Sequence, residues 1–308
     1  MKQANTAKHK VGFTVVGIGE LLWDCFADSR RPGGAPANVV FHLGQLGISA
    51  AVCSRVGRDD PGEELLRYLR DHDVSTDLVQ QEDERPTGKV TVNADQADNP
   101  TYVIHEDVAW DYIELDRPLR RAARDVAAVC FGTLAQRSLA SRETIRQVVQ
   151  IAGDAVRVFD VNLRPPFYNE DVVRGSLALA DVVKLNIQEL SIVAEMAGLR
   201  ADTPVSQARA MCAAFGFMAV CVTRGEGGCL LVSEHECVDL PGEHVSVVDA
   251  VGAGDAFTAG LIYGLLADWP LRQTGWLANG MGGLVASRQG AMPALGAEFE
   301  ALAKETAG

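Results

Sequence analysis

The sequence lacks the patterns that mark metal-binding, disulfide-rich and membrane proteins. Its seven cysteines include no C-x-x-C pair and its six histidines form no Cys/His group, so we expect neither a zinc site nor a disulfide framework. Most cysteines stand in apolar runs such as Val129-Cys130-Phe131, which favours buried free thiols. No stretch approaches the roughly 18 apolar residues of a membrane span, and residues 1–10 lack the apolar core of a signal peptide. These absences favour a reduced, cytoplasmic protein.

Basic residues are also scarce. The chain has 28 Lys and Arg against 41 Asp and Glu, a net charge of −13, which argues against nucleic acid or an anionic membrane as a partner. A nucleotide would therefore be bound locally, by backbone amides, a few cations and Mg²⁺. The sequence has no Walker A lysine motif, which excludes a P-loop NTPase.

What the chain does have is a regular alternation of strands and helices. At 308 residues and 47% hydrophobic composition it can bury a sizeable core. Apolar runs predict strands at 13–18, 51–56, 126–131, 156–161, 182–185 and 218–223. Helical patterns cover 35–46, 62–71, 142–151, 171–180, 187–196, 204–215, 256–266 and 272–287. This order predicts one α/β domain over residues 11–308, with a mostly parallel sheet covered by helices on both faces. Residues 1–10 are expected to be a flexible N-terminus.

Two segments interrupt the alternation. Residues 20–32 form an irregular insertion after the first strand, and residues 86–107 read as two extended pieces joined by a polar turn at 95–99. Short antiparallel pieces near the end of a parallel sheet would make a lid over a cleft, although an ordinary surface hairpin fits the same pattern.

The run from Asp249 to Asp255 is the strongest chemical signal. Its small residues precede an apolar helix, so the amides of Gly252, Ala253 and Gly254 would be free to bind an anion. Asp255 falls in the first turn of that helix, where it could act as a base or simply cap the helix. A helix N-terminus lowers the pKa of a carboxylate, so we expect a lowered pKa for Asp255.

Polar residues follow several of the other predicted strands. Gly33-Gly34-Ala35-Pro36-Ala37-Asn38 opens the first long helix, and Asp24 precedes it, so a carboxylate and an amide could bind a polyol together. The remaining runs are Asp160-x-Asn162-x-Arg164-Pro165, Asn186-x-x-Glu189 and Thr223-Arg224-Gly225-Glu226-Gly227-Gly228. Ligands of open α/β sheets bind at the carboxyl ends of strands, where these runs stand. Taken alone, Glu189 reads as a solvated or capping-box residue, and the glycine-rich run as a hairpin.

At these residues the chain resembles the ribokinase/PfkB family of sugar kinases, most of all its bacterial fructokinases. The Gly33–Asn38 and Asp249–Asp255 runs match the two signatures of the family, and the other three runs match in the expected order. The resemblance spans roughly residues 12–293, and residues 90–111 also resemble the lid of fructokinases. It implies a ribokinase-like α/β fold with a small β lid.

The resemblance also implies a role for each matching residue. Asp255 would be the base, and Gly252, Ala253 and Gly254 would form the anion hole. Asp24, Gly34, Asn38 and Arg164 would hold the sugar, while Asn186, Glu189, Thr223, Gly225 and Asn279 would line the nucleotide. Glu189 would act on Mg²⁺ through water, and Asp249, with carbonyls from residues 285–290, would hold K⁺. Ala250-Val251 departs from the family pattern, in which a hydroxyl residue is common. ATP, Mg²⁺ and a small sugar would be the ligands, and the family precedent is a homodimer formed through the lid.

Several alternatives stay open at this stage. Val15–Glu20 resembles the start of an NAD-binding fold, but Leu22 stands where its third glycine is expected. A non-catalytic sugar-binding protein would have no need of Asp255. Among kinase acceptors we expect fructose first, with phosphate moving to a primary hydroxyl. The positive charge of Arg164 would suit an acid sugar such as 2-keto-3-deoxygluconate, and Arg30 and Arg31 would suit a phosphorylated sugar. Ribose, tagatose and a nucleoside are further candidate acceptors.

Overall fold

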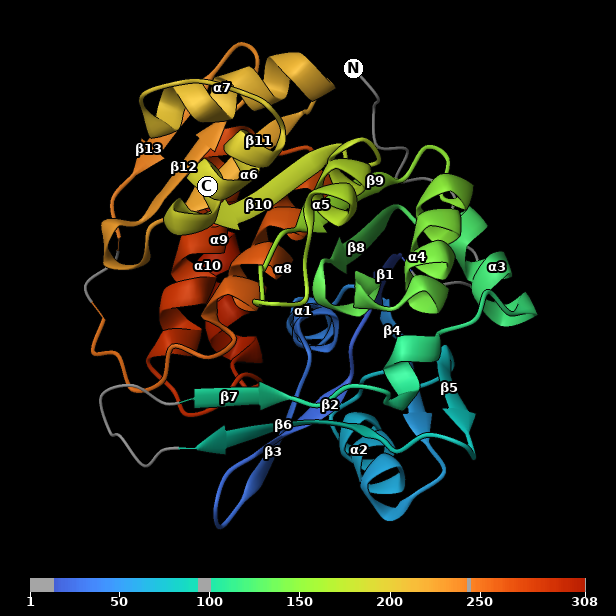
Figure 1. The fold of residues 1–308 in the computed structure, drawn as a ribbon. Coiled ribbons are helices and arrows are strands. Elements are labelled where there is room, and N and C mark those ends of the chain that lie inside the picture. Colours follow the sequence, from blue (N-terminus) through green and yellow to red (C-terminus); the bar gives the residue numbers. More distant parts are fainter. Residues whose placement is uncertain (1–13, 94–100, 243–244, 308) are drawn as a thin grey trace.

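The computed structural model describes residues 14–93, 101–242 and 245–307. Within this part of the chain, nine strands form one sheet in the order β13-β12-β11-β10-β9-β8-β1-β4-β5 (Figure 1). Its strands are β1 (Val15–Ile18), β4 (Ala50–Gly57), β5 (Val79–Glu82), β8 (Ala128–Gly132), β9 (Val156–Asp160), β10 (Val182–Asn186), β11 (Ala219–Thr223), β12 (Cys229–Val232) and β13 (Cys237–Leu240). Every pair from β11 to β5 is parallel, and only β12 and β13 run antiparallel to their neighbours.

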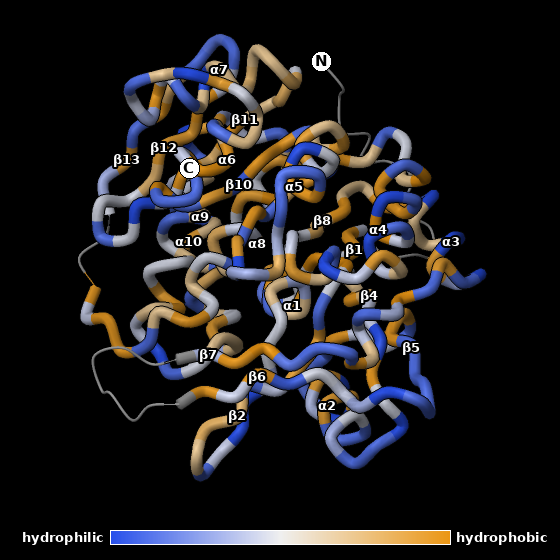
Figure 2. Tube along the Cα trace, in the orientation of Figure 1, coloured by the Kyte–Doolittle hydropathy of each residue, from blue (hydrophilic) through white to orange (hydrophobic). Residues whose placement is uncertain are grey.

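Helices cover both faces of this sheet. One face carries α1 (Ala35–Gln45), α8 (Ala253–Leu266), α9 (Leu271–Ala286) and α10 (Gly296–Ala307). The other carries α3 (Arg117–Asp125), α4 (Leu139–Ile151), α5 (Glu170–Leu177), α6 (Ile187–Met196) and α7 (Pro204–Phe215). α2 (Asp60–Asp71) packs beside α1 in a separate cluster. Figure 2 shows hydrophobic residues along the central strands and hydrophilic ones on the outer surfaces of the helices, as a sheet buried on both faces requires.

A second, four-stranded sheet lies across the carboxyl ends of the central strands (Figure 1). Its order is β3-β2-β6-β7, with bounds Arg30–Gly33, Leu22–Cys25, Gly88–Asn93 and Thr101–Ile104. The pairs β2–β3 and β6–β7 are antiparallel, whereas β2 and β6 run parallel. This is the lid that the two interruptions of the alternation predict, and we call it the lid sheet.

The parallel sheet, its two helical layers and the lid sheet confirm the fold predicted from the sequence. The structure adds elements that the sequence pattern missed, namely β5, α3, the antiparallel pair β12–β13 and α10. α3 was missed because it is strongly polar, with two buried residues on its inner side. The N-terminal segment 1–10 and the turn 95–99 lie outside the described residues.

Two expectations from composition can be compared with the structure. All seven cysteines are free, and five of them are buried, as their apolar surroundings predict. None of the helices found in the described ranges is long and apolar enough to cross a membrane.

Candidate active site

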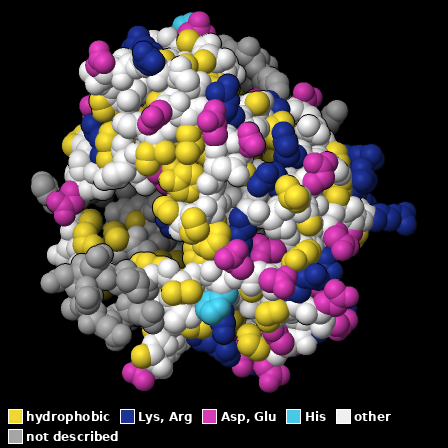
Figure 3. All heavy atoms as spheres, viewed as in Figure 1, with side chains coloured by type: hydrophobic (Ala, Val, Ile, Leu, Met, Phe, Trp, Pro, Cys, Tyr) yellow, Lys and Arg dark blue, Asp and Glu magenta, His cyan; other side chains and the backbone are white. Residues whose placement is uncertain are grey.

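The predicted site residues converge where the parallel strands end. β1, β8, β9, β10 and β11 all point their carboxyl ends toward the lid sheet, and α8 begins at the same edge (Figure 1). The visible surface is hollowed between the body of the molecule and the lid region, and hydrophobic side chains lie beside the hollow (Figure 3). This is the edge at which open α/β sheets bind ligands.

Helix α8 begins as the sequence predicts. Gly252, with φ 81°, is its N-cap, and a Cβ there would lie 2.6 Å from Cα of Ala291, so only glycine fits this turn. The expectation that the Ala253 amide is free is wrong, because it donates to the carbonyl of Ala250 at 3.3 Å. The amides of Gly254 and Asp255 belong to the first turn, where an α-helix provides no carbonyl acceptor. An anion placed here would meet these donors and the positive end of the helix dipole.

Asp255 is held against the first helix of the chain. Its Oδ2 accepts a hydrogen bond of 2.6 Å from Nδ2 of Asn38, which lies one turn into α1. Burial and, to a smaller extent, the nearby negative charge of Asp160 raise the pKa of Asp255 to about 6, while Lys184 opposes both. The lowered pKa expected from the helix N-terminus is therefore wrong. Desolvation and a neighbouring carboxylate outweigh the helix dipole here.

A buried charge pair that sequence reasoning missed supports this turn. Nζ of Lys184, on β10, lies 3.1 Å from Oδ1 of Asp160, at the end of β9. Oγ1 of Thr258, one turn after Asp255 on α8, donates to Oδ2 of Asp160 at 2.7 Å. A Cβ on Gly254 would lie 3.0 Å from Nζ of Lys184, so this ammonium sits directly beneath the first turn of α8.

A signal for Lys184 was present in the sequence. Val182-Val183-Lys184-Leu185 reads as a strand buried on both faces, and a lysine in such a strand needs a buried partner. Asp160 was noted only as one of three polar groups at a strand end. The pairing itself could not be read from the sequence, because it depends on β9 and β10 being neighbours in the sheet.

Three of the predicted sugar-binding residues come from the lid sheet and the start of α1, namely Asp24, Gly34 and Asn38. A Cβ on Gly33 would lie 2.5 Å from Oδ2 of Asp24, so a larger residue there would displace this carboxylate. Gly34 has φ 114°, and a Cβ there would lie 2.3 Å from the Glu20 carbonyl. Burial raises the pKa of Asp24 to about 6, while Arg164 and Arg31 lower it. The exposed Arg164 also lowers the pKa of Asp255, so its charge reaches the same region.

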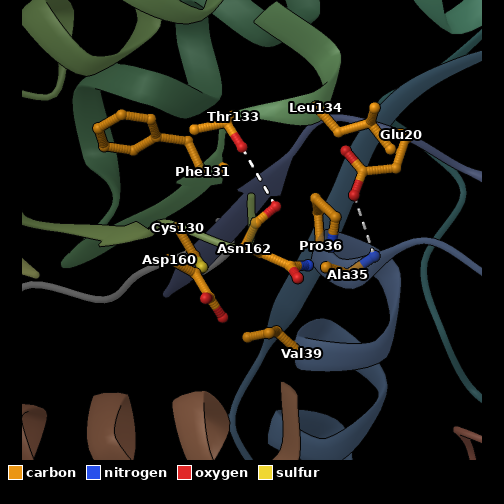
Figure 4. Close-up of a pocket in the computed structure, with 11 residues that line it drawn as sticks. Glu20, Ala35, Pro36, Val39, Cys130, Phe131, Thr133, Leu134, Asp160 and Asn162 are labelled. Carbon is orange, nitrogen blue, oxygen red and sulfur yellow. Dashed lines mark hydrogen bonds between the residues drawn. The ribbon is translucent and has the colours of Figure 1, made fainter. Parts of the chain in front are cut away.

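Glu20 is a second buried carboxylate that sequence reasoning did not assign to the site. It is 5% exposed, and its Oε1 accepts from the Ala35 amide at 3.3 Å, whereas its Oε2 has no partner in the part of the chain that the structure describes. Figure 4 shows it lining an internal cavity together with Asp160 and Asn162. The cavity has space for about one water molecule, which could hydrogen-bond to these polar groups. Burial raises the pKa of Glu20 to about 7.

Asn186 and Glu189 form a capping box at the start of α6. Oδ1 of Asn186 accepts from the Gln188 and Glu189 amides, and Oε2 of Glu189 accepts from the Asn186 amide at 2.8 Å. The other oxygen, Oε1, accepts from the Leu163 amide at 2.7 Å, which joins α6 to the segment after β9. Burial raises the pKa of Glu189. Each carboxylate oxygen keeps a lone pair, so water-mediated binding of Mg²⁺ remains compatible with this geometry.

The predicted nucleotide residues at the far end of the site are also neighbours. Gly225 lies in the turn after β11, and a Cβ on Gly228 would lie 2.1 Å from the Leu240 carbonyl. Nδ2 of Asn279, on α9, donates to the next carbonyl, that of Pro241, at 2.9 Å. Thr223 ends β11 and its Oγ1 lies 3.5 Å from the Leu185 carbonyl. The turn after β11, the end of β13 and α9 thus form one continuous wall.

The described residues contain no cluster of three or more His, Cys, Asp or Glu side chains that could hold a metal by themselves. Mg²⁺ does not require such a cluster, because it binds through one or two carboxylates together with waters and substrate phosphates.

Known proteins match nearly the whole chain. A family model described as pfkB family carbohydrate kinase matches residues 11–297. A fructokinase from Vibrio alginolyticus is 32% identical over 304 residues, which cover 92% of this chain and 96% of the relative.

Solved structures show the same fold with ligands bound. An uncharacterized sugar kinase from Pyrococcus horikoshii, in complex with ATP, aligns with a TM-score of 0.78 and 29% identity, over 90% of this chain and 94% of that one. A fructokinase from Vibrio cholerae O395, in its fructose, ADP and calcium ion bound form, aligns with a TM-score of 0.79 and 25% identity, over 94% and 98% of the two chains. The chain therefore belongs to the pfkB family of carbohydrate kinases.

Proposed function

We propose that the protein transfers the γ-phosphate of ATP to a primary hydroxyl of a monosaccharide, with fructose as the acceptor to test first. The observation that carries this proposal is the position of Asp255. Its carboxylate lies in the first turn of α8, beside the free amides, and touches Asn38 of the predicted sugar site. A base and an anion site are thereby adjacent, which is what phosphoryl transfer to a hydroxyl requires.

In the proposed reaction Asp255 accepts the proton of the sugar hydroxyl. The hydroxyl oxygen forms a bond to the γ-phosphorus, the bond from that phosphorus to the β,γ-bridging oxygen breaks, and ADP leaves. The amides of the first turn of α8 stabilise charge on the transferring group, and each such donor contributes about 2.7–4 kcal/mol. With a pKa of about 6, Asp255 is ionised at neutral pH and is a better base than an ordinary aspartate.

Asn38 and Lys184 have distinct supporting roles in this proposal. Asn38 fixes the orientation of the Asp255 carboxylate through its hydrogen bond. Lys184 balances the charge of Asp160, which would otherwise raise the pKa of Asp255 further. Mg²⁺, when bound near Glu189 through water, would neutralise charge on the ATP phosphates.

We choose fructose as the first acceptor to test because of the relatives of this chain and because of the lid sheet. The Vibrio fructokinases match almost the whole chain, and the lid sheet is present. Relatives at this sequence identity support the phosphorylation of a sugar, but they do not identify which sugar is the acceptor. The family kinases for 2-keto-3-deoxygluconate, ribose, tagatose or a nucleoside are therefore the alternatives, and Arg164 is the residue that would receive an acid sugar.

The test is an acceptor panel with ADP release as the readout, using fructose, ribose, tagatose, 2-keto-3-deoxygluconate and adenosine. We expect the highest kcat/KM with fructose. A higher kcat/KM with another acceptor would exclude fructose as the preferred substrate but still support a sugar kinase. No turnover with any acceptor would contradict the kinase activity itself. Thermal stabilisation by ATP–Mg²⁺ but not by NAD separates the kinase from an oxidoreductase.

We also propose a homodimer formed through the lid sheet. Its edge strand β7 exposes Tyr102 by 57% and Val103 by 49%, so each face of this strand carries an uncovered apolar side chain. Tyr102→Lys together with Val103→Lys should convert the dimer to a monomer in sedimentation experiments. A wild-type monomer would contradict this proposal without affecting the kinase.

A further inference from the structure

Arg31 joins the lid sheet to the turn that precedes α8. Its Nη1 lies 3.0 Å from Oδ2 of Asp249, with the two side chains 33% and 18% exposed. The same Oδ2 accepts from the Gly290 amide at 3.0 Å, and Oδ1 accepts from the Val251 amide at 3.1 Å. One carboxylate therefore holds together β3, the turn into α8 and the segment after α9.

These contacts occupy most of the oxygen lone pairs that a monovalent cation would need as ligands at Asp249. Both hydrogen-bond acceptor sites of Oδ2 are taken, one of them by a guanidinium. The Ala286 carbonyl, within the 285–290 stretch expected to supply cation ligands, accepts from the Val248 and Asp249 amides at 2.9 and 3.2 Å. The donor set therefore fits poorly with a bound K⁺, and a positive charge is already present.

The Arg31 guanidinium also faces the predicted sugar site. β2 and β3 pair Asp24 with Arg31, and Arg31 lowers the pKa of Asp24 whereas Asp249 raises it. The guanidinium lies 4.8 Å over the ring of Phe26, which limits its freedom. It thus stands between two carboxylates, one on the sugar side and one on the phosphate side.

We propose that Arg31 takes the place of a monovalent cation at Asp249, so that the turn into α8 is held by the lid sheet and turnover does not require K⁺. The inference rests on the proposed kinase function. Arg31 is a positioning residue: it acts through Asp249 and Val251 on the amides that bind the transferring phosphate. Because those amides act mainly in the transition state, its loss should lower kcat more than it raises KM.

Arg30 provides a matched control. It lies on the same strand, pairs with Glu64 and stacks 4.7 Å over Trp23, so Arg30→Gln removes the same charge without touching Asp249. Wild-type kcat should be equal in KCl and in tetramethylammonium chloride at the same ionic strength. Arg31→Gln should lose about tenfold or more in kcat and regain much of it in KCl, whereas Arg30→Gln should do neither. Arg31→Lys should retain part of the rate.

A second readout does not depend on turnover. KCl, compared with tetramethylammonium chloride, should raise the Tm of Arg31→Gln by mass action and leave wild type and Arg30→Gln unchanged. K⁺ activation of the wild type, equal kcat values for the two Gln variants, or an Arg31→Gln variant that K⁺ neither reactivates nor stabilises would each overturn the inference. A wild type that phosphorylates no acceptor would instead contradict the kinase, and the Tm measurement would still test Arg31.

Discussion

Nδ2 of Asn38 donates a 2.6 Å hydrogen bond to Oδ2 of Asp255, across 217 positions of the chain. The contact brings the predicted sugar-binding amide and the predicted base into one unit. Oδ1 of the same amide is buried and has no hydrogen-bond partner among the described residues. A buried acceptor atom of this kind is costly unless a ligand satisfies it, and a sugar hydroxyl is a suitable donor.

The first prediction concerns Asp255→Asn. We expect kcat to fall about 10²–10⁴-fold, because the amide cannot accept the proton. The fold and ATP binding should persist, since an amide oxygen can still accept from Asn38. Steady-state kinetics and calorimetric titration with ATP measure the two effects. Activity near the wild-type level would remove Asp255 from the role of base.

The second prediction concerns the pH dependence of kcat/KM. Asp255 and Asp24 both have pKa values of about 6, and the proposed function needs both as carboxylates. Their protonation should therefore make log(kcat/KM) fall below pH 6 with a slope approaching about two. Asp24→Asn should lower kcat/KM throughout and reduce the slope to about one. An unchanged slope in that variant would show that Asp24 does not titrate in the free enzyme.

The third prediction separates the charge of Lys184 from its contribution to stability. Lys184 lowers the pKa of Asp255, so Lys184→Met should move the acid limb of the kcat profile to higher pH. Arg157→Met is the control. Arg157 pairs with Asp181 at the opposite ends of the same two strands, with side chains 24% and 14% exposed.

Both substitutions break an ion pair between β9 and β10, and both should lower the free energy of unfolding. Only Lys184→Met should shift the pH profile. If the two variants lose stability but have wild-type pH profiles, Lys184 is structural and does not tune the base.

The fourth prediction concerns Glu20→Gln. Burial raises the pKa of Glu20 from 4.5 to about 7, so between these values the native state binds more protons than the unfolded chain. Raising the pH therefore lowers the free energy of unfolding across this window. Above pH 7 the buried carboxylate is ionised, and its full destabilising effect is present. The glutamine should stabilise the protein at pH 8 by roughly 1–3 kcal/mol and have little effect at pH 5.

Urea denaturation at the two pH values measures this difference. Because Gln can still accept from the Ala35 amide, the helix start should be preserved. A variant less stable than wild type at pH 8 would show that ionised Glu20 has a partner, such as an ordered water network in its cavity.

The sequence predicted the fold and the runs that meet at the carboxyl ends of the strands, because both depend on local patterns. Strand–helix alternation and the small residues around Gly252 are visible in single runs of sequence. The pKa of Asp255 was predicted in the wrong direction, since it depends on burial and on Asp160, which is brought near by the sheet order. Lys184 and Arg31 form their ion pairs across 24 and 218 positions, and no local pattern specifies such partners.

One consequence follows from the junction between the lid sheet and α1. β3 ends at Gly33 and α1 begins at Ala35, so Gly34 alone separates them. Inserting or deleting one residue here would turn the helix by about 100° relative to the strand. Asn38 would then face away from Asp255. Loops elsewhere in the chain can be lengthened without moving Asn38. At this junction the number of residues between β3 and α1 must stay the same, whichever residues these are.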